Sequence, residues 1–200
     1  MTTLLLASAS PRRREMLQRV GLLLEVRPAE IDEAPLEAED PTVYVRRIAR
    51  AKAAATARRA DEWVLAADTT VTLDGQILAK AESPEEAVRM LRWLSGRTHQ
   101  VITAFILVGE RDGAPIVHEG VVGTEVTFVE LSAAVVADYV ASGEWRGKAG
   151  AYAIQGIGAA LVASVNGSVT NVIGLPLVEV LAALREAGGP QPRFAAGTPA

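Results

Sequence analysis

The sequence predicts an α/β protein, and three observations carry that prediction. Residues 3–29 read as strand, helix and strand, which is the order of an α/β unit. Apolar runs of strand length alternate with amphipathic helices further along the chain. The 200 residues, half of them hydrophobic, suffice for one large domain or for two small lobes that share a core.

In the first half of the chain, local residue patterns predict where each helix and strand begins and ends. A short buried strand over residues 3–8 leads into a helix that Ser10 and Pro11 begin, and a second strand over 22–29 follows. An acidic loop is expected over residues 30–40. The next elements are a helix from Pro41 to about Arg59, capped by Asp40, a strand over 63–68 that ends on Asp68, and a hairpin over 69–80 that turns at an Asp-Gly pair.

The second half begins with a helix over residues 83–96, for which Ser83 and Glu86 form a capping box. The remaining expected elements are long strands over 99–110 and 115–131, a helix over 132–143, a glycine-dense stretch over 143–177 and a terminal helix after it. We expect residues 1–188 to form a single domain and residues 189–200 to be a flexible C-terminal tail.

Composition excludes several classes of function. A net charge of −4 and nine aromatic residues argue against a nucleic-acid surface. The absence of cysteine excludes disulfides, thiol catalysis and cysteine-based zinc sites. No signal-peptide pattern and no apolar run of about 20 residues occurs, so we expect a cytoplasmic protein without a membrane segment.

The stretch "SASPRRRE" places arginines at the start of a helix, where the helix dipole is already positive. Unpaired backbone N–H groups at such an end bind anions, and Arg12 and Arg13 could each bind a phosphate or carboxylate bidentately. The alternative is a solvated basic turn that pairs with the acidic loop. The stretch alone favours neither interpretation.

Asp68 is the second candidate, because it follows a largely apolar run and so is expected at the carboxyl end of a strand, where α/β sheets present ligands. A buried carboxylate there could hold Mg²⁺ or accept a proton from water. Taken alone, an Asx-turn to the N–H groups of Thr69 and Thr70 explains Asp68 somewhat better.

Other candidates are weaker when taken singly. Lys52 and Lys80 fit ordinary surface lysines, and Glu33 lies in an acidic loop that could also supply oxygen ligands to a cation. His99 and His118 have no evident catalytic partner, so both are interpreted as structural. The letters "GIGAAL" only partly imitate a dinucleotide fingerprint and are set aside. Taken together, the cations and carboxylates fit a polyphosphate ligand with a divalent metal.

The ordered motifs resemble the Maf-type nucleoside triphosphate pyrophosphatases. The matching stretches are "LASASPRRREML", "EIDE", "ARAKA", "AADTTVTLDGQILAK", "RTHQVITA", "GKAGAYAIQGIGAALV" and "GSVTNVIGLPL". The resemblance implies an elongated central mixed sheet flanked by helices, in two lobes with a cleft between them. It also implies hydrolysis of the α–β phosphoanhydride bond, a divalent cation (Mg²⁺ or Mn²⁺), a homodimer and a role in cleaning nucleotide pools.

The resemblance assigns roles residue by residue. It makes Asp68 the proton acceptor that activates water, and it places Glu33 beside Asp68 at the metal. The residues that it implies for phosphate binding are Ser8, Ser10, Arg12, Arg13, Lys52 and Lys80.

Within the family, three positions separate a branch acting on dTTP and UTP from a branch acting on 7-methyl-GTP. Arg12, Thr69 and Gln155 resemble the first branch, whereas the second typically carries Trp, Gln and Glu. The alternatives are the 7-methyl-GTP branch itself and a division-arrest or septation regulator that acts through nucleotide binding.

Overall fold

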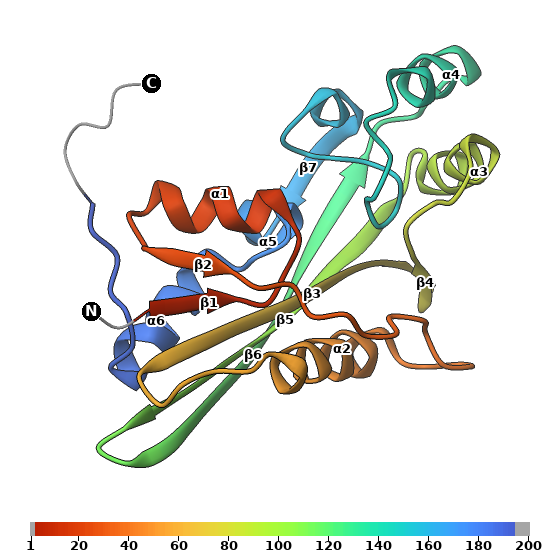
Figure 1. Cartoon of the computed structure of the whole chain (residues 1–200). Coiled ribbons are helices and arrows are strands. Elements are labelled where there is room, and N and C mark those ends of the chain that lie inside the picture. Colours follow the sequence, from red (N-terminus) through yellow and green to blue (C-terminus); the bar gives the residue numbers. More distant parts are fainter. Residues whose placement is uncertain (1–2, 195–200) are drawn as a thin grey trace.

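The structure is a computed structural model that describes residues 3–194 (Figure 1). Its strands are β1 (Thr3–Leu6), β2 (Leu24–Val26), β3 (Glu62–Leu73), β4 (Gln76–Leu78), β5 (Thr98–Arg111), β6 (Ala114–Phe128) and β7 (Val162–Asn166). Its helices are α1 (Pro11–Arg19), α2 (Pro41–Ala55), α3 (Pro84–Leu94), α4 (Ala133–Ser142), the 3₁₀ helix η1 (Ile157–Leu161), α5 (Val169–Ile173) and α6 (Leu177–Ala187).

The strands form one mixed sheet in the order β2-β1-β3-β5-β6-β7, with β4 on the side of β3. The strand β1 runs parallel to β2 and β3, whereas β5, β6 and β7 are each antiparallel to the preceding strand of the sheet. The parallel part is the α/β unit that the first thirty residues predict. The α/β class and the mixed sheet flanked by helices are therefore confirmed.

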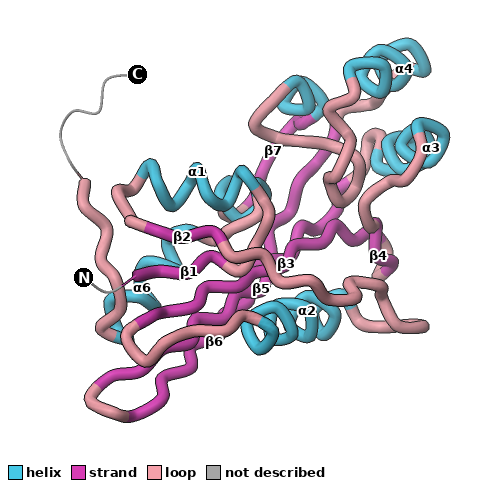
Figure 2. Tube along the Cα trace, viewed as in Figure 1, coloured by secondary structure: helices cyan, strands magenta, loops and turns pink. Residues whose placement is uncertain are grey.

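Alternate residues of the strands pack on opposite faces of the sheet, as the two-residue period of a strand requires. On one face, Leu4 and Leu65 pack with residues of α1 and α6. On the other face, Leu5 and Val64 pack with α2. Figure 2 shows α1 and α2 on opposite sides of the strands.

A third apolar cluster forms where β3, β5 and β6 continue beyond β1. Val71 and Val101 of the sheet pack there with Leu91 of α3 and Tyr139 of α4. Figure 1 shows α3 and α4 together at this end, away from α1 and α2. The molecule therefore has two lobes that share long strands.

Several predicted elements are longer than the observed ones, and the difference is largest for two of them. The strand expected over 22–29 is only Leu24–Val26, an edge strand that pairs with β1 alone, and short edges resist unwanted pairing. The helix expected to reach Arg59 ends at Ala55 because Thr56 is extended, with φ −94° and ψ 107°.

The prediction that a strand ends at Asp68 is wrong. The strand β3 runs on to Leu73 because β5 pairs with it residue by residue from Val64 to Thr72. The expected turn follows, with Asp74 and Gly75 both at positive φ. The paired residues of β5 lie 28 to 44 positions away in the chain, so the local pattern does not show them.

The C-terminal segment from Gly188 to residue 194 has no helix or strand. Its main chain lies against Gly21, where a Cβ would stand 2.0 Å from the carbonyl oxygen of Arg193. The rest of the tail prediction, residues 195–200, lies outside the described residues. Among residues 3–194, no helix is both long and apolar enough to cross a bilayer.

Candidate active site

A cleft of about 340 Å³ lies where the two lobes meet. One lobe contributes the loop after β1, the start of α1 and Lys52 of α2, and the other contributes Lys80 and residues 147–149 and 152–155. All ten site residues that the sequence predicts line this cleft: Ser8, Ser10, Arg12, Arg13, Glu33, Lys52, Asp68, Thr69, Lys80 and Gln155. The fold thus gathers residues that are up to 147 positions apart in the chain.

The N-terminus of α1 opens into the cleft without a side-chain cap. Ser10 has the extended backbone of an N-cap residue, but its hydroxyl makes no capping hydrogen bond, which corrects the expectation of an ordinary cap. Its backbone N–H donates instead to Ser8 Oγ at 3.3 Å. The first turn holds no acidic residue, so the positive end of the helix remains available to an anion.

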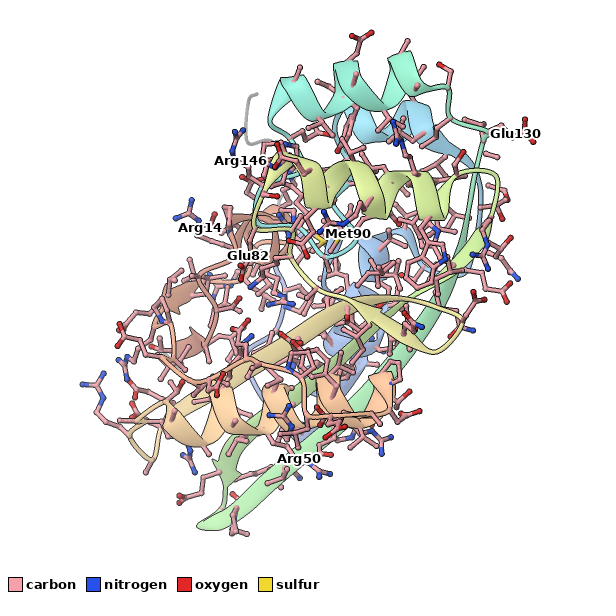
Figure 3. All side chains as sticks on the ribbon, turned by 90° about the vertical axis from the view of Figure 1, so that its right-hand side faces the viewer. Arg14, Arg50, Glu82, Met90, Glu130 and Arg146 are labelled. Carbon is pink, nitrogen blue, oxygen red and sulfur yellow. The ribbon has the colours of Figure 1, made fainter. Side chains whose placement is uncertain are left out.

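The neighbouring arginines have different surroundings. Arg13 is buried, and its guanidinium donates to the carbonyl of Gly174 at 2.7 Å, to Ser8 Oγ at 3.0 Å and to Thr69 Oγ1 at 3.0 Å. Arg12 is half-buried and, within residues 3–194, donates only to the carbonyl of Ile173 at 3.2 Å. Arg14 lies on the outside of α1 and points away from the molecule (Figure 3).

Four charged side chains form a chain of ion pairs across the cleft. Lys52 Nζ lies 2.8 Å from Asp68 Oδ1 and 2.8 Å from Glu33 Oε1. Lys80 Nζ lies 3.1 Å from the other carboxylate oxygen of Glu33. The Lys52 side chain is 7% exposed and Lys80 61% exposed, so the surface-lysine interpretation is wrong for Lys52.

Burial raises the pKa of the Asp68 carboxyl, while the charges of Lys52 and Arg13 oppose that rise. Its Oδ2 is buried and accepts no hydrogen bond from residues 3–194. Neither Thr69 nor Thr70 donates to it within that range, so the Asx-turn alternative is wrong. An unpartnered, buried carboxylate oxygen is a strong acceptor for a water proton or a cation.

The two carboxylates are the oxygen ligands that the described cleft offers to a metal. Burial would raise the pKa of Glu33, but the hydrogen bonds and charges of Lys52 and Lys80 outweigh it and lower that pKa, which keeps Glu33 anionic. No group of three or more acidic or histidine side chains gathers elsewhere within the described range. One or two carboxylates with substrate phosphates is a usual way to bind Mg²⁺, so Glu33 and Asp68 fit such an ion.

Thr69 and Gln155 lie on different sides of the cleft. Thr69 Oγ1 is held by hydrogen bonds with Thr103 Oγ1 at 2.8 Å and with Arg13. Gln155 is exposed in the loop that precedes η1. The three positions that mark the substrate branch, these two and Arg12, therefore face one space.

Lys148 also lines the cleft, and the sequence analysis missed it. Burial, together with the charge of Arg12, lowers the pKa of its ammonium group, so the two cations act on each other across the cleft. The letters "GKAGAY" could have singled out Lys148, since a charged residue amid glycines often faces a ligand.

The two histidines lie outside the cleft, in agreement with a structural role. His99 is buried, and its Nε2 is 2.8 Å from the hydroxyl of Tyr152. Burial lowers the pKa of His99 to about 4, so the ring is neutral at pH 7. His118 lies 3.2 Å from Glu186 on the surface of β6 and α6.

The family model for Maf-like proteins matches residues 3–187. The chain is 51% identical over 189 residues to the dTTP/UTP pyrophosphatase of Anaeromyxobacter dehalogenans, covering 94% of this chain and 96% of the relative. It is 50% identical over 192 residues to the dTTP/UTP pyrophosphatase of Myxococcus xanthus, covering 96% and 95%.

Among solved structures, the Staphylococcus aureus Ham1 protein matches 62% of this chain and 72% of its own, with 18% identity and a TM-score of 0.42. The family assignment does not depend on that match. It follows from the family model and from relatives that share about half of their residues with this chain along nearly its full length. The chain belongs to the family of Maf-like proteins.

Proposed function

We propose that this protein is a nucleoside triphosphate pyrophosphatase that hydrolyses dTTP and UTP to the nucleoside monophosphate and pyrophosphate. The observation that carries the proposal is the charge of the cleft, where five cationic side chains surround two carboxylates in a chain of net charge −4. Such a site suits a triphosphate with a divalent cation. The names of the relatives point to the same activity.

The triphosphate binds at the positive end of α1 and along the cationic side chains. The half-buried Arg12 and the exposed Lys80 both line the cleft and can reach it. Arg13 has two of its five N–H groups beyond the three hydrogen bonds that it makes in the protein. The hydroxyls of Ser8 and Ser10 and the ammonium of Lys52 complete the phosphate-binding set.

Asp68 accepts the proton of the attacking water. The water oxygen bonds to a phosphorus that flanks the α–β bridging oxygen, the bond from that phosphorus to the bridge breaks, and the leaving phosphate keeps the electron pair. Lys52 orients the Asp68 carboxylate through Oδ1 and leaves Oδ2 for the proton. Burial raises the pKa of Asp68, which strengthens it as a base.

Glu33 and Asp68 would hold the divalent cation, Mg²⁺ or Mn²⁺. The Asp68 carboxylate and the anionic Glu33 are suitable hard oxygen ligands. When bound, such a cation neutralises charge on the phosphates.

Gln155, Thr69 and Arg12 select the substrate. A neutral glutamine amide both donates and accepts hydrogen bonds, as the imide edge of uracil or thymine does. A glutamate in its place would suit the cationic ring of 7-methylguanine. The homodimer that the family resemblance implies and the cytoplasmic location that the sequence pattern suggests remain predictions.

A substrate panel tests the proposal. With Mg²⁺ or Mn²⁺ present, we expect kcat/KM for dTTP and UTP to exceed that for CTP, GTP and 7-methyl-GTP by at least about tenfold, since an unpaired polar edge costs that much or more. The products must be pyrophosphate and the monophosphate. A preference for 7-methyl-GTP would overturn the substrate assignment, release of orthophosphate would overturn the bond assignment, and binding without turnover would favour a nucleotide-dependent regulator.

A further inference from the structure

We propose that Glu144 and Tyr139 are positioning residues that fix the recognition loop, residues 153–158, and thereby aim Gln155 at the base. This inference rests on the proposed function, because it explains how the enzyme holds its specificity-determining side chain. Neither residue lines the cleft, so each would act through the loop rather than on the substrate.

Three backbone N–H groups of the recognition loop donate hydrogen bonds to these two side chains. Ala153 N–H donates to Tyr139 Oη at 3.2 Å. Ile157 N–H donates to Glu144 Oε1 and Gly158 N–H donates to Oε2, both at 2.8 Å. Both ends of the six-residue loop are thus hydrogen-bonded to one short segment of the same chain, residues 139–144.

The two side chains also support each other. Tyr139 Oη donates to Glu144 Oε2 at 2.8 Å, and burial together with that hydrogen bond raises the pKa of the phenol, so it stays protonated. Burial would raise the pKa of Glu144, but the hydrogen bonds from Gly158, Ile157 and Tyr139 outweigh it and lower that pKa. The carboxylate is therefore ionised at neutral pH, and its bonds to the loop are charge-assisted.

The glycines of the loop show how closely the carboxylate approaches. A Cβ on Gly156 would lie 1.8 Å from Glu144 Oε1, although its φ of −120° is open to any residue. A Cβ on Gly158 would lie 2.7 Å from the carbonyl oxygen of Ala153 and 3.0 Å from Tyr139 Oη. The Gly-Ile-Gly letters that imitate a dinucleotide fingerprint thus make room for Glu144 and Tyr139.

The side chain of Gln155 makes no hydrogen bond within residues 3–194 and is exposed at the cleft. Its direction is therefore set by the backbone of the loop alone. Loosening that backbone would spread the amide over many positions, which weakens recognition of the base more than binding of the phosphates.

The substitution that tests the proposal is Glu144→Gln. A glutamine keeps the shape but offers one acceptor oxygen in place of two, so one loop N–H would face an amide NH₂ group. Tyr139→Phe removes the second tie without changing the packing. The matched control is Glu62→Gln, because Glu62 also accepts a backbone N–H, that of Arg59 at 2.7 Å, but lies outside the cleft.

Amide hydrogen exchange measures the loop directly. In Glu144→Gln, one of the Ile157 and Gly158 amides loses its acceptor, and we expect its exchange rate to rise about tenfold or more, as the loss of one charge-assisted hydrogen bond implies. We expect Glu62→Gln to leave exchange at both amides unchanged. Unchanged exchange at both amides in Glu144→Gln would overturn the proposal. This readout does not require turnover, so it separates failure of the proposal from failure of the proposed function, which would appear as a wild type inactive on the substrate panel.

Kinetics measure the consequence for specificity. The ratio of kcat/KM for UTP over CTP should fall about tenfold in Glu144→Gln and less in Tyr139→Phe, through KM more than through kcat. In a Gln155→Ala background, Glu144→Gln should leave that ratio unchanged, because the side chain that it positions is gone. A uniform loss on all nucleotides, or full additivity with Gln155→Ala, would overturn the positioning role.

Discussion

The role of Lys52 depends on its surroundings in the folded protein. On an alanine-rich helix it reads as an ordinary surface lysine, yet the structure buries it between Asp68 and Glu33. A lone buried carboxylate or ammonium is costly, and each of these groups offsets that cost for the others. The burial that makes Asp68 a stronger base is therefore sustained by Lys52.

Sequence reasoning could identify Asp68 and the arginines, because each breaks a local rule of strand or helix composition. It could not identify the burial of Lys52, whose partner Asp68 lies on a different element. It could not identify Glu144 either, because its hydrogen-bond partners follow only after a stretch of irregular chain.

Substituting the neighbouring arginines should separate binding from stability. The sequence alone suggests that Arg12→Ala and Arg13→Ala both weaken substrate binding without affecting the fold. The structure buries Arg13 with three hydrogen bonds, so we expect Arg13→Ala to lower the free energy of unfolding by about 2–3 kcal/mol and Arg12→Ala by less than about 1 kcal/mol.

Urea unfolding measures the stabilities, and steady-state kinetics measure KM, which both variants should raise. Arg14→Ala, from the same turn but pointing outward (Figure 3), is the control and should change neither quantity. An Arg13→Ala variant as stable as the wild type would contradict the structural role of Arg13.

At the scale of elements, the cleft depends on where strands end. The strand β1 stops at Leu6, opposite Leu65, and β4 joins the same side of β3 only at Val71. Between these points no other strand of the described structure pairs with that side of β3, and Asp68 and Thr69 lie in this gap. The sequence predicts that Asp68 lies at a strand end, but the strand that ends beside it is β1, the parallel neighbour of β3.

The structure of the glycine-dense segment, residues 143–177, could not be predicted from local sequence patterns. Its β7 exists through pairing with β6, and its η1 begins where Glu144 receives the first loop N–H groups. Both contacts are non-local, so neither hydrophobic period nor turn chemistry predicts them. The helix α3, which has the local Ser83 cap, lies within two residues of its predicted bounds at both ends.

His99 of β5 and Tyr152, just before the recognition loop, share a hydrogen bond whose contribution to stability should depend on pH. Burial lowers the pKa of His99 from 6.5 to about 4, so the unfolded chain binds more protons than the folded one between these values. The stability that neutral His99 contributes is complete above pH 6.5 and is lost as the pH falls through about 4.

When the pH falls from 6.5 to 4, we expect the free energy of unfolding of the wild type to fall by about 3 kcal/mol more than that of His99→Gln. The reason is that one pKa unit corresponds to about 1.4 kcal/mol. Glutamine can keep a hydrogen bond to Tyr152 without titrating. Urea unfolding across this pH range measures the difference, and parallel pH profiles for the two proteins would show that His99 does not titrate as described.

At the scale of the whole molecule, the site exists only when both lobes are folded. The cleft is lined by residues from Ala7 to Gly174, and β3, β5 and β6 run through both lobes (Figure 2). The protein has a net negative charge, yet its cationic side chains gather in the cleft. A polyanion is therefore attracted to the cleft more strongly than to the rest of the surface.

The central claim is that this cleft hydrolyses the α–β bond with Asp68 as base. Asp68→Asn keeps the size of the side chain and the two ion pairs of Glu33, but removes the proton acceptor. The matched control is Asp74→Asn, the same substitution at an exposed turn position of positive φ that asparagine tolerates.

The deciding measurement is pyrophosphate release from UTP by these two variants and the wild type, with nucleotide binding measured in parallel. We expect Asp68→Asn to lose about 10²–10⁴-fold in turnover while it still binds the nucleotide, and Asp74→Asn to match the wild type. Undiminished turnover in Asp68→Asn would contradict it.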